Sequence, residues 1–68
     1  MRLLGERLRE LRTDKEIDIN TLSAAVGIGA TTIRDWERGK HDIKGDQLII
    51  LADYFGVKVG YLLGVEDS

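Results

Sequence analysis

The polar side chains that could do chemistry are concentrated in residues 30 to 38. If this stretch is a helix, at about 100° per residue, Ile33, Trp36 and Glu37 lie together on one side of it. The other side then presents hydroxyl, guanidinium and carboxylate groups, on Thr31, Arg34, Asp35 and Arg38. Such groups on adjacent turns can match the hydrogen-bond donors and acceptors on the edges of bases. The alternative is an ordinary solvated helix face, and the residues alone leave both interpretations open.

Little in the sequence supports enzymatic or metal chemistry. Cysteine is absent, His41 is the only histidine, and the serines are Ser23 and Ser68, so a hydrolase triad has almost no material. A single histidine without companion ligands makes a metal site improbable. The pair of glycines at 27 and 29 is not a dinucleotide loop, because Thr32 stands where the third glycine would be. We therefore expect no enzyme, no cofactor and no metal.

Composition and charge describe one small domain. The chain has 68 residues, with ten basic against twelve acidic side chains and a formal net charge of −2. That balance argues against a strongly basic nucleic-acid binder, although Glu66 and Asp67 alone account for the acidic excess. The longest apolar run, residues 48 to 52, is too short to span a bilayer. Charge follows Leu3 and Leu4 at once, so no signal peptide is expected, and we predict a cytoplasmic protein.

Periodicity predicts the elements that must position these side chains. Leu4, Leu8 and Leu11 repeat at helical spacing in residues 2 to 15. A second helix is expected over residues 19 to 26, capped by Asp18 and ended by Gly27. The third covers residues 30 to 38, and a loop covers residues 40 to 45. A fourth helix includes residues 48 to 55, a short fifth one fits within residues 58 to 64, and no strand is expected.

The second and third of these helices are separated only by the glycine turn of residues 27 to 29. Two helices joined in this way form the helix-turn-helix arrangement, in which the second helix is presented to a major groove. We assign residues 1–64 to one all-α domain. Residues 65–68 are expected to be a tail or the start of a linker.

The span from residue 4 to residue 64 resembles the phage-repressor and Cro type of helix-turn-helix domain, also called the xenobiotic-response-element family. The resemblance is carried by residues 5–12, 32–40, 51–57 and 61–64, which read GERLRELR, TIRDWERGK, LADYFGV and YLLG. It implies a five-helix lambda-repressor-like bundle that binds double-stranded operator DNA. It also implies a homodimer on a palindromic operator, with helix 30–38 in the major groove, regulating transcription as a repressor.

The resemblance also implies roles for single residues. Ala30, Thr31 and Asp35 take the positions nearest base edges, and Thr32, Arg34 and Arg38 lie beside them. The alternative for Asp35 is an ion pair with Arg34 or Arg38. Phosphate candidates follow in the loop, at Lys40, His41 and Lys44, where ordinary solvation is the alternative. Arg12 and Glu37 match a structural ion pair of the family.

Several departures from the family pattern predict weak binding by a single half-site. Ile19 replaces a phosphate-binding Gln, Gly29 replaces a capping Ser or Thr, and Ile43 replaces a Pro. Basic groups of the first helix are expected to add positive charge to the surface, at Arg2, Arg7 and Arg9. We expect binding to depend on dimerisation and to vary only shallowly with salt.

A homodimer surface is expected at one of two places. Ile50 and Tyr54 form an exposed pair on the fourth helix, and Leu62 and Leu63 on the fifth helix are the second candidate. An exposed isoleucine also fits the competing hypothesis, a protein-interaction module of the same fold with weak or no DNA binding.

Overall fold

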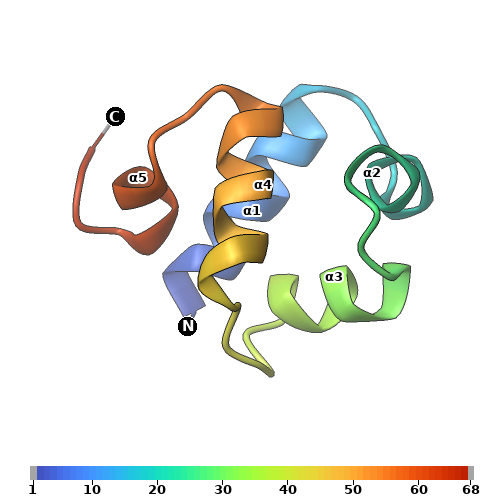
Figure 1. Ribbon diagram of the computed structural model, residues 1–68, viewed down its shortest axis with the longest axis horizontal. Helices are drawn as coiled ribbons and strands as arrows, with labels where there is room; N and C mark the ends of the chain where they lie inside the picture. The colour runs from blue at the N-terminus through green and yellow to red at the C-terminus, as the bar shows by residue number, and fades with distance from the viewer. Residues whose placement is uncertain (1, 68) are drawn as a thin grey trace.

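Five helices account for most of the residues described in the computed structural model, which are residues 2–67 (Figure 1). They are α1 (Arg2–Asp14), α2 (Ile19–Val26), α3 (Ala30–Glu37), α4 (Gly45–Phe55) and α5 (Val59–Leu63). Within those residues no strand occurs, which confirms the predicted all-α class. The domain measures 27 × 23 × 20 Å. None of its described helices combines the length and the apolar character needed to cross a bilayer.

Helix ends follow local backbone chemistry. Gly27 ends α2 and Gly56 ends α4, each with a left-handed backbone at φ 71° and 68° that suits a residue without Cβ. Three predicted boundaries were wrong by a residue, and one of them is the end of α3, which is Glu37 instead of Arg38. The first helix ends at Asp14 because Glu16 takes a left-handed backbone with φ 59°. Glutamate rarely adopts this conformation, so its residue type did not predict the end of the helix. The fourth begins at Gly45, so the predicted loop over 40–45 is shorter.

The core is formed by apolar side chains from all five helices. The fully buried ones are Leu4, Leu8, Leu22, Ile33, Leu51 and Leu62. In Figure 1, α5 lies to one side of α4 while α2 and α3 lie to the other. α1 packs against both α3 and α5. This first helix therefore joins the helix-turn-helix half of the domain to its carboxyl-terminal half.

Gly5 lets α1 and α3 approach each other closely. A Cβ at position 5 would overlap the carbonyl oxygen of Trp36 and would lie 2.9 Å from that of Glu37. Both obstacles are backbone atoms, which cannot rotate away as a side chain can. The glycine inside α1 is thus required by packing against the carboxyl-terminal end of α3.

Arg7 fastens α5 to α1. Its Nη1 donates to the carbonyl oxygen of Tyr61 and to that of Glu66, the latter at 2.8 Å. The guanidinium also stacks over the Tyr61 ring, with its Cζ 4.3 Å from the ring centroid. Leu62 of the same helix is fully buried. Its expected role at a dimer surface is therefore wrong, because its side chain is packed inside the core.

Candidate nucleic-acid interface

α3 is held in place by the side that faces the core. Ile33 is fully buried and Trp36 is 3% exposed. The turn before the helix is fixed by Ser23, whose Oγ donates to the carbonyl oxygen of Ile28 at 2.6 Å. At the start of α2, the Asp18 carboxylate accepts from the Thr21 backbone N–H at 2.7 Å. A side-chain hydrogen bond thus joins α2 to the turn that precedes α3.

Arg12 and Glu37 form a bidentate ion pair between α1 and the end of α3. Arg12 Nε donates to Glu37 Oε2 at 2.7 Å, and Nη2 donates to Oε1 at 3.1 Å. Arg12 Nη1 also donates to the carbonyl oxygen of Ile17 at 2.9 Å. The side chains are only 14% and 7% exposed. Hydrogen bonding to Glu37 raises the pKa of the Arg12 guanidinium above its ordinary value. The pair anchors α3 and neutralises its own two charges.

The side of α3 away from the core presents polar groups to solvent. Thr31, Thr32, Arg34 and Arg38 are exposed, and Ala30 is half-buried at the helix start. This exposed set, together with Asp35, is called the reading face below. It has hydroxyl and guanidinium donors on successive turns, and no packing against the core accounts for them. Such a surface can accept the edges of bases or the phosphates beside them.

Asp35 contacts His41 rather than a neighbouring arginine. Its Oδ2 lies 3.6 Å from His41 Nε2, and its side chain is 23% exposed. Among residues 2–67 no ion pair joins it to Arg34 or Arg38, so those guanidinium groups are not held by this carboxylate. The sequence reasoning missed this contact because His41 lies beyond the helix, in the loop that folds back toward it.

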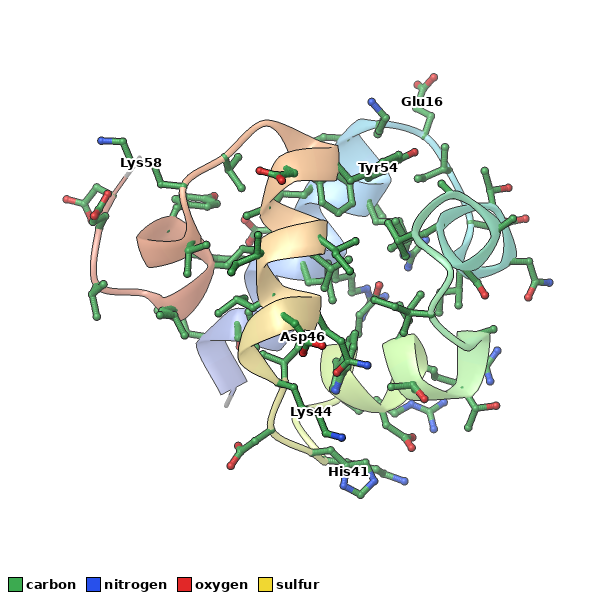
Figure 2. All side chains as sticks on the ribbon, in the orientation of Figure 1. Glu16, His41, Lys44, Asp46, Tyr54 and Lys58 are labelled. Carbon is green, nitrogen blue, oxygen red and sulfur yellow. The ribbon has the colours of Figure 1, made fainter. Side chains whose placement is uncertain are left out.

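The loop between α3 and α4 carries the predicted phosphate candidates. Lys40, His41 and Lys44 are all exposed, and Figure 2 shows His41 and Lys44 at the same end of the molecule as α3. Lys44 precedes α4 directly and has an extended backbone, with φ −75° and ψ 151°. The loop therefore adds exposed basic side chains beyond the helix, with the exposed Asp42 among them.

The basic residues of α1 that we expected at this surface do not all lie there. Arg9 lines a hollow of about 220 Å³ with Ile19 and with residues of the reading face. Arg7 is instead turned to α5, so its expected contribution to this surface is wrong. Residues two positions apart on a helix are rotated by about 200° from each other. Helical geometry alone could therefore have placed Arg7 and Arg9 on different sides of the first helix. The Arg2 side chain lies outside the part of the molecule that the structure describes.

Exposed apolar side chains lie on two other surfaces. Ile50 is 44% exposed as expected, and the adjacent Ile49, which the sequence reasoning missed, is 54% exposed. Tyr54 is half-buried, edge-on to Phe55 with ring centroids 5.0 Å apart, so the expected exposed pair with Ile50 is wrong for Tyr54, which packs against the core. A second apolar surface, called the terminal apolar surface below, includes Leu3, Leu63 and Val65, at 42%, 38% and 76% exposure.

Comparison with known proteins identifies several similar ones. A family model described as helix-turn-helix matches residues 8–62. The uncharacterized HTH-type transcriptional regulator YobD of Bacillus subtilis is 32% identical over 63 residues, which are 93% of this chain and 56% of YobD. The chain spans only part of the curated relatives that it matches, between 20% and 56% of their length.

Two solved structures are also similar. The P22 c2 repressor in complex with synthetic operator 9T has a TM-score of 0.88 and 30% identity, covering 97% of this chain and all of that one. The restriction-modification controller protein C.AhdI from Aeromonas hydrophila has a TM-score of 0.80 and 30% identity, covering 87% of this chain and 89% of that one. These likenesses confirm the repressor-like fold that the sequence resemblance implied.

Proposed function

Because the chain belongs to the helix-turn-helix family, in its phage-repressor and Cro type, we propose that it represses transcription by binding a specific DNA operator. The observation that carries this proposal is that α3 has one side packed against the core and the other side exposed. Its inner side is anchored by Trp36 and by the Arg12–Glu37 ion pair, while the reading face is exposed. The P22 c2 repressor, with nearly the same backbone, is in complex with an operator. The family and its repressors are DNA-binding proteins rather than enzymes, so we expect no catalytic activity.

The reading face would enter the major groove, with different residues serving different atoms. Ala30 and the Thr31 methyl group can contact a thymine methyl, and Thr32 can donate to or accept from a base or phosphate. The Asp35 carboxylate can accept from the amino group of cytosine. Arg34 and Arg38 can donate in pairs to guanine or to phosphate oxygens.

The loop residues Lys40 and Lys44 would contact phosphates beside the groove. Such contacts fix the orientation of the protein and carry no base information directly. Each specific base contact of the reading face is expected to contribute about 1–3 kcal/mol of discrimination.

We further propose that two copies bind a palindromic operator. Two-fold symmetric repressors place their reading helices about one DNA turn apart, on two half-sites. The terminal apolar surface supports this arrangement, because Leu3, Leu63 and Val65 are exposed and the Leu3 side chain lies against Gly64, the residue between the other two. Ile50 on α4 remains the other candidate contact.

The proposal is tested by selecting an operator from a pool of random-sequence duplexes and then measuring affinities at one salt concentration. Thr31→Ala, Arg34→Ala and Asp35→Ala should each change the preferred base at one position. Lys58→Ala serves as the control, since Lys58 is exposed and lies far from His41 and Lys44 (Figure 2). If all three variants keep the wild-type base preference, α3 does not read the operator.

The exposed pair Ile49 and Ile50 favours a second candidate, a protein-interaction module of the same fold. Single exposed apolar residues are common, but two adjacent isoleucines on one helix form a larger contact surface. Under this candidate, an Ile50→Glu substitution would abolish partner capture. Absence of salt-sensitive DNA binding by the wild-type protein would favour this candidate over the repressor.

A further inference from the structure

Asp35 is the acidic residue of the reading face, and its charged partner lies outside α3. The other members of that face are neutral or basic, with the guanidinium groups of Arg34 and Arg38. A carboxylate among them can accept from a base, but it also repels the DNA phosphates around it. The group that lies against Asp35 therefore influences how this carboxylate acts in a groove.

The chain turns back at the end of α3 in a way that brings His41 to Asp35. Gly39 has a left-handed backbone with φ 73°, and its N–H donates to the Trp36 carbonyl oxygen at 3.0 Å. The Lys40 N–H donates to the Asp35 carbonyl oxygen at 2.9 Å. These two bonds form a Schellman motif, which ties the backbone after a helix to its last turn. His41, the next residue, is thereby held beside the Asp35 side chain, with Nε2 3.6 Å from Oδ2.

The distance between the two side chains makes their contact depend on charge. At 3.6 Å it is too long for a hydrogen bond, so a neutral imidazole does not hold the carboxylate. A protonated imidazole attracts the carboxylate. Both side chains reach water, at 66% exposure for His41 and 23% for Asp35, so the imidazole can take up a proton and the two groups can approach. The contact is therefore an ion pair only when His41 is protonated.

The charged residues around this contact belong to α3, to the loop after it and to the start of α4 (Figure 2). They are Arg34, Glu37 and Arg38 on α3, Lys40, Asp42 and Lys44 in the loop, and Asp46 on α4. His41 is the only histidine of the chain, and histidine is the side-chain type whose charge changes between pH 5 and 8. A change of pH in this range therefore acts on this surface through His41.

We propose that His41 is a positioning residue for base recognition, which acts through Asp35. The inference rests on the proposed function, in which the Asp35 carboxylate accepts from the amino group of cytosine. With a neutral His41, the carboxylate is available for that bond. With a protonated His41 it is paired, so its attraction for the amino group and its repulsion of acceptors on other bases both weaken. The domain thus distinguishes cytosine from other bases better at high pH than at low pH.

The competing role for His41 is a direct contact with a phosphate, and one quantity separates the two roles. A phosphate contact adds affinity on every sequence, because it carries no base information. The ratio of the affinities for two duplexes that differ in a single base pair therefore cancels this contribution. An effect through Asp35 changes the ratio, and it does so only at the base pair that Asp35 contacts.

The experiment uses the operator selected for the wild type and the base pair at which Asp35→Ala changes the preference. Affinity is measured at fixed salt, between about pH 5 and about pH 8, for that operator and for a duplex with this base pair replaced. The variants are His41→Gln, which has no titrating group, and His41→Lys, which keeps a positive charge. Lys44→Gln is the matched control, because it changes another exposed residue of the same loop. Circular dichroism and thermal unfolding at both pH values verify that each variant is folded.

We expect the wild-type ratio to fall about three- to fivefold between the high and the low pH, which is the upper part of what an exposed ion pair supplies. His41→Gln should keep the high ratio at both pH values, and His41→Lys should give the low ratio at both. Lys44→Gln should weaken binding to both duplexes and retain the wild-type change of the ratio. At the base pair assigned to Thr31, the ratio should not change with pH in any of these proteins.

Three results would overturn the inference in distinguishable ways. If the wild type binds the operator and its ratio is the same at both pH values, His41 does not act through Asp35, and the proposed function stands. If both affinities rise together at low pH with a constant ratio, and His41→Gln removes that rise, His41 contacts a phosphate instead. If the wild type binds no duplex at either pH, the proposed function fails and this inference fails with it.

Discussion

Breaking the Arg12–Glu37 ion pair is the perturbation whose energetic cost can be worked out most directly from the structure. At roughly 0.1 kcal/mol per residue, a chain of 68 residues has about 7 kcal/mol of folding stability. Removing one partner of a buried ion pair costs about 3–5 kcal/mol, because the other charge stays buried without compensation. Arg12 is 14% exposed beside a hollow open to water, which places the cost at the lower end. Arg12→Met should thus lose about 3 kcal/mol.

Glu37→Gln is expected to be milder. The amide retains one oxygen acceptor, and Arg12 keeps its bond to the Ile17 carbonyl at 2.9 Å. A loss of about 1–2 kcal/mol follows, since the partners are still hydrogen-bonded. Arg12→Met combined with Glu37→Leu removes both charges together and should recover much of the stability, because neither side chain is then left charged in the core.

Urea unfolding followed by the fluorescence of Trp36, the only tryptophan and 3% exposed, measures these differences. The slope of free energy against urea should stay constant among the variants. In thermal unfolding, about 3 kcal/mol corresponds to a lowering of the midpoint by about 12–24 °C for a domain of this size. The reasoning is refuted if the double variant loses the sum of the losses of Arg12→Met and Glu37→Leu, each measured alone, because two partners in contact must couple.

Three further predictions concern other parts of the scaffold. Hydrogen bonds from Thr21 lower the pKa of the Asp18 carboxyl, so its stabilisation is present above about pH 4 and is lost as pH falls through the lowered value. Asp18→Asn keeps the cap but should remove that pH dependence. The free energy of unfolding is measured from pH 2 to 6 for the wild type and the variant, and two profiles of the same shape would contradict this. Gly5→Ala should cost about 1–3 kcal/mol through overlap with the Trp36 backbone, and an unchanged midpoint would show that α1 and α3 can separate cheaply. Arg7→Gln should release α5, seen as faster amide hydrogen exchange there and not in α3; uniform acceleration would mean that the whole domain opens instead.

Most of the fold could be predicted because its signals are local. The leucines of α1 repeat at helical spacing, Asp18 caps α2, and Gly27 ends it with a left-handed backbone. The burial of Ile33 and Trp36 followed from the rotation of side chains around one helix. Each of these features depends only on residues within a turn or two of each other.

The remaining features depend on which helices meet, and the spacing of residues does not encode that. Gly5 is an ordinary helix glycine in the sequence, and its purpose appears only against the backbone of α3. Arg7 and Arg9 are both basic residues of α1, but one binds α5 and the other lines the hollow. Leu62 was expected at a dimer surface, and it is fully buried.

The close approach at Gly5 has a mechanical consequence. Where side chains separate two helices, a change of rotamer lets them slide past each other. Here the backbone of α1 meets the carbonyl groups at the end of α3, and there is no rotamer to change. The two helices should move as one body, so exchanging the outward residues Thr31, Thr32 and Arg34 alters what α3 touches without altering its angle. Under the proposed function, the domain could therefore be retargeted to new operators by surface substitutions alone, with the docking geometry inherited unchanged.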